Sequence, residues 1–176
     1  MFRLGLEPER EEDRQRFSRK VLERYYARTV EAVRKHDPGM PIFHNSGGID
    51  RSRPELLQKY FSHLELESLP TGGWGYDFFP LSAGFARKTG LHFVGMTGKF
   101  HGGWGEFGSF KHPNALRYEC ALALANGAGI SIGDQLHPDG RLDESTYRII
   151  GAAYREVREK EPYCRCAKNR AEIALI

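Results

Sequence analysis

Apolar positions recur with two spacings along the chain, and these spacings predict helices separated by short strands. Residues 9–36 repeat an apolar side chain every four positions from Phe17 to Val33, which is the pattern of an amphipathic helix with charged residues on its other face. Pro162 is expected to end the final helix because proline lacks the backbone N–H that continues the hydrogen-bond ladder. Further helices are expected at 52–60, in the second half of 76–88, at 113–125 and at 144–161.

Short apolar runs between these helices predict strands. Strand and helix alternate four times, and this alternation is typical of parallel strands joined by crossover helices. The predicted fold class is therefore α/β, built from parallel βα repeats. The four predicted strands are 41–44, 63–67, 91–96 and 130–133, and residues 171–176 resemble the start of a further strand.

Two glycine-rich loops repeat one motif. The sequence Gly-Gly-Trp-Gly at 72–75 recurs at 102–105, and each copy follows a predicted strand. In parallel α/β folds, ligands bind in the loops that follow the carboxyl ends of strands. Glycine allows the backbone of such a loop to approach a ligand closely. The repeat therefore predicts a ligand site on these loops.

Two carboxylates at predicted strand ends are the candidate catalytic residues. Glu65 and Glu67 alternate with leucines, so both leave the same face of their strand, and Glu67 lies nearer its carboxyl end. Glu67 is therefore predicted to be catalytic, the alternative being an edge strand with two surface glutamates. Asp134 directly follows the apolar run 130–133, so it is either a second catalytic carboxylate or a cap for the following turn.

Side chains suited to sugar recognition accompany these carboxylates. Indole rings stack on the apolar face of a pyranose, and carboxylates accept hydrogen bonds from its hydroxyl groups. For Lys99 and His101 the alternative is ordinary loop surface, and for the tryptophans it is packing in a small satellite core. The predicted substrate-binding residues are Asn45, Trp74, Tyr76, Lys99, His101 and Trp104.

Charge and hydropathy narrow the class of partner. Net charge is only +3, from 26 basic and 23 acidic residues, which excludes a dominant polyelectrolyte role. A nucleic acid partner is therefore not expected, although RNA or phosphate binding through the basic segment 14–35 is a third interpretation. No apolar run approaches the roughly 20 residues that span a bilayer, so no membrane partner is expected.

The cysteines and the sequence motifs indicate the cellular compartment and whether a metal or cofactor is expected. Three cysteines and no visible secretory leader favour a reducing cytoplasm. The pair Cys164 and Cys166 lacks a second pair of ligands, so no metal site is predicted. The glycine-rich loops match neither the phosphate-binding nor the dinucleotide-binding pattern, so no cofactor is predicted.

Three stretches of the chain resemble a known group of enzymes. Residues 63–77, 95–107 and 131–138 are similar to bacterial glycoside hydrolases related to alpha-L-fucosidases that carry a beta-galactosidase-like trimerisation domain. The resemblance implies a (β/α)₈ catalytic barrel, of which the four βα units would form the C-terminal half. It implies that residues 1–163 belong to the barrel, and that 164–176 form a linker and the start of a truncated trimerisation-like domain.

The resemblance also implies an activity, the hydrolysis of O-glycosidic bonds in fucosidase- or galactosidase-type sugars. On matching positions it makes Glu67 an acid/base or substrate-binding carboxylate, with Asp134, Lys99, His101, Trp74 and Trp104 in the sugar subsites. Four βα units leave a barrel unclosed, so we expect a homo-oligomer or a partner that supplies the missing half, and incomplete activity of this chain alone. The alternative is a non-catalytic carbohydrate-binding or structural half-barrel remnant.

Overall fold

The computed structural model describes residues 1–45, 47–168 and 170. They divide into two units. The first contains residues 1–45 and 50–63, and the second contains residues 47–49 and the described residues from 64 onward. Each unit has its own core, and the candidate catalytic carboxylates both belong to the second.

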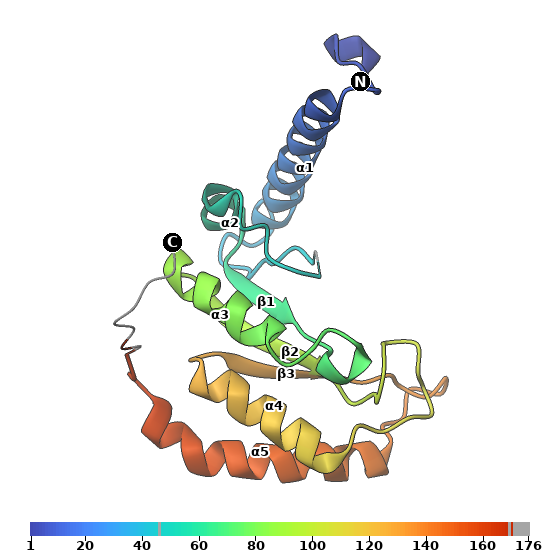
Figure 1. Cartoon of the computed structure of the whole chain (residues 1–176), viewed down its shortest axis with the longest axis vertical. Helices are drawn as coiled ribbons and strands as arrows, with labels where there is room; N and C mark the ends of the chain where they lie inside the picture. The colour runs from blue at the N-terminus through green and yellow to red at the C-terminus, as the bar shows by residue number, and fades with distance from the viewer. Residues whose placement is uncertain (46, 169, 171–176) are drawn as a thin grey trace. The chain divides into compact units, whose positions relative to one another are not determined.

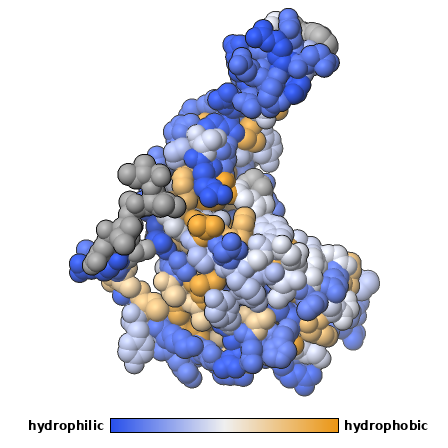
Figure 2. All heavy atoms as spheres, viewed as in Figure 1, coloured by the Kyte–Doolittle hydropathy of each residue, from blue (hydrophilic) through white to orange (hydrophobic). Residues whose placement is uncertain are grey.

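The first unit is helical. It contains the short η1 (Phe2–Leu4), the 24-residue α1 (Glu11–Arg34) and α2 (Pro54–Tyr60), as the apolar spacing predicted for the two longer helices. The face of α1 that is visible in Figure 2 is mostly hydrophilic. Tyr26 is its main buried anchor, and its ring lies 4.4 Å from that of His44 and 5.3 Å from that of Phe61, centroid to centroid. Burial in this aromatic cluster lowers the pKa of His44.

Residues 41–44 do not form the strand that their apolar run predicted. The backbone N–H of Ile42 donates to Ser62 Oγ at 2.7 Å, and its carbonyl accepts from the Ser62 N–H at 2.8 Å. Ile42 therefore pairs with a single residue instead of a strand ladder, and Pro41 has no N–H to extend one. The prediction of a strand here is wrong, and the described residues contain three strands, not four. The strand expected at 171–176 lies outside the described residues.

The other three predicted strands are confirmed and form one parallel sheet. They are β1 (His63–Glu67), β2 (His92–Gly98) and β3 (Gly129–Gly133), in the order β1-β2-β3 (Figure 1). β2 and β3 run parallel, with register partners from Val94 and Gly129 to Gly98 and Gly133. The fold class is α/β, as the alternating pattern predicted.

Helices cover one face of this sheet. They are α3 (Phe78–Thr89), α4 (Pro113–Ala125) and α5 (Glu144–Cys164), with the short η2 (Pro70–Gly72) after β1. A Cβ added to Gly95 of β2 would lie 2.8 Å from the Phe79 ring and 3.1 Å from Ala123 Cβ, so α3 and α4 meet the same face at this residue. α5 packs along α4 (Figure 1). Among the described residues, no helix combines the length and the apolar character needed to cross a membrane.

Local signals set the ends of these helices, with one exception. Asp143 accepts hydrogen bonds from the backbone N–H groups of Ser145 and Thr146 at 2.7 and 3.2 Å, which caps α5 and lowers the pKa of the Asp143 carboxyl. Pro162 does not end α5, contrary to expectation, because the helix continues to Cys164. A proline in the final turn removes only one ladder bond, and the Arg165 N–H still reaches Glu161 O at 3.1 Å.

The core of the second unit lies between β3, α4 and α5. Leu116, Cys120, Ile150 and Ala153 form a buried cluster, and Ile130 and Ile132 of β3 pack against it. Burial raises the pKa of the Cys120 thiol to about 12, so this cysteine is a core residue and remains protonated at neutral pH.

A buried ion pair joins α4 to β2. Lys111 Nζ donates to Glu119 Oε2 at 2.6 Å and to Thr97 Oγ1 at 2.7 Å, and the two charged side chains are 1% and 6% exposed. The Lys111 backbone N–H also donates to Lys99 O at 2.6 Å. The pair therefore fixes both the start of α4 and the end of the second glycine-rich loop.

This burial leads to a prediction for stability. Lys111→Met leaves the Glu119 carboxylate buried without a counter-charge, so the free energy of unfolding should fall by about 3–5 kcal/mol in chemical denaturation. Arg117→Met is the matched control, because Arg117 lies on α4 as Glu119 does. Its loss breaks a half-exposed ion pair with Glu156 of α5 and should cost less than about 1 kcal/mol. Equal losses in the two variants would contradict the structural role of the buried pair.

Candidate functional site

Glu67 and Trp104 meet at the carboxyl end of the sheet. Leu64 and Leu66 are only 3% and 2% exposed, and the half-buried Glu65 and Glu67 alternate with them, on the sheet face opposite to the leucines. The indole Nε1–H of Trp104 donates a hydrogen bond to Glu67 Oε1. A residue at the end of β1 is thus joined to one in the loop after β2, as expected for neighbouring parallel strands.

The ring of Trp104 rests on a pair of glycines. Gly98 and Gly133 are register partners at the ends of β2 and β3. A Cβ on Gly133 would overlap with Cη2 and Cζ3 of the indole, and one on Gly98 would lie 3.5 Å from Cζ3. Any side chain at residue 133 would displace the ring, so this position requires glycine for close approach.

Gln135 completes the attachment of Trp104 to the third strand. Its side-chain Nε2 donates to Trp104 O at 2.8 Å. Trp104 therefore contacts the ends of β1, β2 and β3 together. Gln135 and the two glycines were not among the predicted site residues, although the two-residue period through β3 puts Gln135 in phase with Gly133.

The carboxylate group of Asp134 is enclosed, although the residue as a whole is half-buried. Neither carboxylate oxygen has a hydrogen-bond donor among the described residues, and both are inaccessible to solvent. The Asp134 carboxylate accepts no hydrogen bond from a backbone N–H of the described residues, so it does not cap the following turn, which was the alternative interpretation of this residue. None joins it to Glu67 or Trp104 either. A buried acceptor without a donor costs free energy, so Asp134 is suited to accept a hydrogen bond from a ligand.

Lys99 braces the second glycine-rich loop from within. Its side chain is buried, and Nζ donates to the carbonyl oxygens of Phe107 and Ser109 at 2.8 and 3.2 Å. The ammonium also lies 4.7 Å from the centre of the Phe110 ring, within range of a cation–π interaction. His101 is exposed, and its backbone N–H donates to Ser109 Oγ at 3.0 Å. His101 is therefore the more accessible of the two predicted residues.

Trp74, in the first copy of the repeat, has different surroundings from Trp104. It is 37% exposed, and its ring packs edge-on against Phe78, with 5.0 Å between centroids. Together with Gly47 and Gly48 these two rings line an open groove.

Tyr76 and Asn45 are the remaining predicted substrate-binding residues. The hydroxyl of Tyr76 donates to Glu119 Oε1 at 3.4 Å, and its ring packs edge-on against Tyr118. Tyr76 therefore contacts α4, on the face of the sheet that carries the helices. Asn45 belongs to the first unit, where it is exposed.

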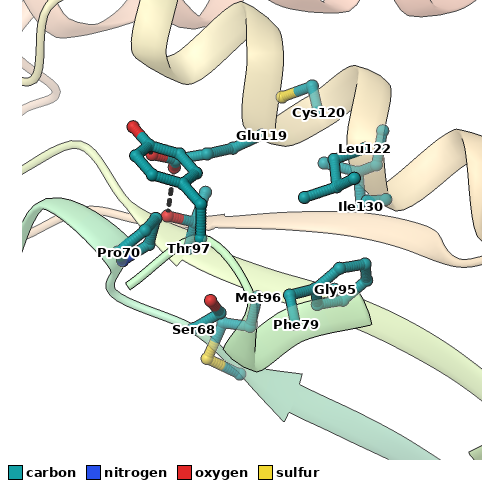
Figure 3. Close-up of a pocket in the computed structure, with 12 residues that line it drawn as sticks. Ser68, Pro70, Phe79, Gly95, Met96, Thr97, Glu119, Cys120, Leu122 and Ile130 are labelled. Carbon is teal, nitrogen blue, oxygen red and sulfur yellow. Dashed lines mark hydrogen bonds between the residues drawn. The ribbon is translucent and has the colours of Figure 1, made fainter. Parts of the chain in front are cut away.

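A narrow cavity lies between the sheet and its helices (Figure 3). Thr97 Oγ1 donates to Glu119 Oε2 at 2.6 Å beside it, and Cys120, Leu122 and Ile130 form its apolar wall. Neither Glu67 nor Trp104 is among its lining residues. This cavity is a feature of the packing layer and does not belong to the candidate site. In the part of the chain that the structure describes, no three or more His, Cys, Asp or Glu side chains are grouped so as to hold a metal ion.

Comparisons with known proteins bear on this geometry. No protein-family model matches the chain, and no curated protein matches it. Among solved structures it is similar to the alpha-L-fucosidase isoenzyme 2 from Paenibacillus thiaminolyticus, with 57% sequence identity and a TM-score of 0.92 over 98% of this chain. The chain is related to an alpha-L-fucosidase. It spans 26% of the length of that protein.

The glycine seat of Trp104 can be tested by adding one methyl group. In a Trp74→Phe background, Gly133→Ala should shift the fluorescence of Trp104 to longer wavelength and lower the free energy of unfolding by about 1–3 kcal/mol, because the ring must leave the sheet. Gly129→Ala in the same strand is the control, since its Cβ would meet Val94 Cγ2 at an ordinary 3.4 Å. An unchanged Trp104 spectrum in Gly133→Ala would contradict the described contact.

Proposed function

We propose that this chain is part of a glycoside hydrolase of the alpha-L-fucosidase type, with its sugar site at the carboxyl ends of the sheet. The observation that carries the proposal is the 57% identity to an alpha-L-fucosidase over nearly the whole chain. The contact between Glu67 and Trp104 supports the location, because it holds a carboxylate and an indole together at the end of parallel strands where such folds bind ligands.

Glu67 has the chemistry of an acid/base residue in this reaction. Glycosidic hydrolysis passes through an oxocarbenium-like transition state and typically uses two carboxyl groups, one of which exchanges a proton with the leaving oxygen or with water. Oε1 of Glu67 accepts from Trp104, whereas Oε2 has no hydrogen-bond partner among the described residues. We propose that Oε2 faces the glycosidic bond or a hydroxyl of the sugar.

Asp134 is the proposed second carboxylate. Its two buried oxygens without donors would accept hydrogen bonds from sugar hydroxyls, or one of them would serve the reaction directly. His101 at the exposed end of the loop is a further proposed hydroxyl partner. For Lys99 the bonds to two loop carbonyls favour a role in holding the loop.

The exposed indole of Trp74 is a proposed platform for a pyranose ring. An open groove lined by two aromatic rings and two glycines offers apolar surface to the C–H face of a sugar. Tyr76 and Asn45 remain proposed substrate residues on the sequence pattern alone, because Tyr76 lies in the first glycine-rich loop and Asn45 directly follows the apolar run 41–44.

We propose that the complete site includes more polypeptide than this chain. The fucosidase to which it is similar is about four times as long, since the chain covers 26% of it. We propose that residues 1–163 are part of a (β/α)₈ barrel, that 164–176 lead into a trimerisation-like domain, and that a second copy or a partner supplies the rest. A carbohydrate-binding remnant without turnover is the alternative that the same incompleteness favours.

Assay of 4-nitrophenyl α-L-fucopyranoside tests this proposal. If the chain hydrolyses it, Glu67→Gln should lower kcat by about 100-fold or more, because it removes the proton-transferring group. Glu65→Gln is the matched control on the same face of β1 and should retain most of the rate. Equal rates in wild type and Glu67→Gln would remove Glu67 from the mechanism.

Calorimetric titration with L-fucose separates the two functional alternatives. Binding without turnover would favour the carbohydrate-binding remnant, and Asp134→Asn should then weaken binding because a buried acceptor is lost. Absence of both binding and turnover would refute a sugar site on this chain.

A further inference from the structure

We infer that Trp104 is a positioning residue for the Glu67 carboxylate and not primarily a sugar platform, an inference that rests on the proposed function. The indole N–H is a donor only, and the atom that accepts from it is Glu67 Oε1. With Oε1 held in this way, the long side chain of Glu67 keeps one orientation, and Oε2 is the oxygen left for a ligand. Holding a catalytic group in the reactive orientation lowers the activation free energy, because the entropy of orienting it is already lost before the reaction.

The contacts of Trp104 with the strand ends hold its side chain rigid enough to orient Glu67. Its ring lies on the glycine pair of Gly98 and Gly133, and its carbonyl accepts from Gln135 Nε2 at 2.8 Å. The loop that carries it is held by the buried Lys99 ammonium, which binds two loop carbonyls. Trp104 is therefore fixed by three strand ends, and a carboxylate positioned by strands is held more precisely than one positioned by a free loop.

The repeated motif provides an internal comparison. Trp74 and Trp104 occupy the same place in two copies of Gly-Gly-Trp-Gly, and the glycines of the two copies touch, since a Cβ on Gly72 would lie 2.9 Å from Gly102 O. Trp74 nevertheless keeps 37% of its surface exposed and packs edge-on against Phe78. The exposed indole suits ligand stacking, whereas the one that bonds to Glu67 suits orientation. The same motif thus serves two purposes.

Indole NMR tests the contact in the absence of any sugar. The chain has two tryptophans, so a ¹⁵N-labelled sample gives two indole signals, which Trp74→Phe assigns. Glu67→Leu should move the Trp104 signal and speed its hydrogen exchange by about tenfold or more, because the acceptor is removed. Glu65→Leu is the matched control and should leave the Trp104 signal in place. A Trp104 signal insensitive to Glu67→Leu would overturn the inference whatever the chain binds.

Kinetics or binding then test the positioning role. If 4-nitrophenyl α-L-fucopyranoside is hydrolysed, Trp104→Phe keeps an aromatic ring and removes the N–H, so kcat should fall about 10- to 100-fold with KM within a factor of about two. Trp74→Phe should instead raise KM, as expected for a stacking residue. If L-fucose is bound without turnover, Trp104→Phe should weaken binding while a folded spectrum is retained.

The outcomes separate the two claims. If Trp104→Phe has the kcat of the wild type, the positioning role is overturned and the proposed function stands. Where there is no turnover, an unchanged affinity of Trp104→Phe for L-fucose has the same meaning. An effect of Trp104→Phe on KM alone would make Trp104 a substrate platform and also overturn it. If the unmodified chain neither binds L-fucose nor hydrolyses the nitrophenyl fucoside, the proposed function fails, and the positioning role fails with it even where the NMR result supports the contact.

Discussion

The candidate site depends on the seating of one indole on the ends of three strands. Trp104 can reach Glu67 only because the sheet presents two glycines, Gly98 and Gly133, in register beneath its ring. A hydrogen bond from a mobile surface tryptophan would not fix the orientation of the Glu67 carboxylate. Here the ring, the loop carbonyl bonded to Gln135 and the carboxylate of Glu67 are linked in one continuous set of contacts. The geometry of the carboxylate is therefore a consequence of backbone packing at the sheet.

The two faces of the sheet are used differently. One face carries α3 and α4, which approach so closely that residue 95 has no room for a side chain. The buried pair of Lys111 and Glu119 ties this helical layer to β2, and it also holds the end of the loop that delivers Trp104. The other face carries Glu67 and the indole. The charges of the buried pair thus satisfy each other on the helical side, while Oε2 of Glu67 on the opposite side has no hydrogen-bond partner among the described residues.

Several features were predictable because they follow from local chemistry. Alternating Leu and Glu residues in 63–67 specify which side chains share a face, and this held in β1. Pro113 begins α4 because a proline lacks an N–H, and the first N–H groups of a helix have no partner within it. Asp143 marks the start of α5 because its carboxylate accepts hydrogen bonds from the first backbone N–H groups of the helix. The strand expected at 41–44 does not form, because an apolar run predicts burial but does not supply a neighbouring strand to pair with. Ile42 instead forms its backbone hydrogen bonds with Ser62. Pro162 does not end α5 because it lies in the last turn, where its missing N–H removes only one hydrogen bond from the helix.

The sequence by itself therefore determined most of the elements, their α/β alternation and the presence of carboxylates and indoles after the strands, since these depend on spacing along the chain. Only the tertiary structure decided how those groups are used. Trp74 and Trp104 share one motif, yet the fold exposes one and joins the other to Glu67. Lys99 carries a charge that could serve a ligand, yet the fold directs it to loop carbonyls. Such differences depend on contacts between residues tens of positions apart, such as the 37 that separate Glu67 from Trp104, and no local pattern encodes them.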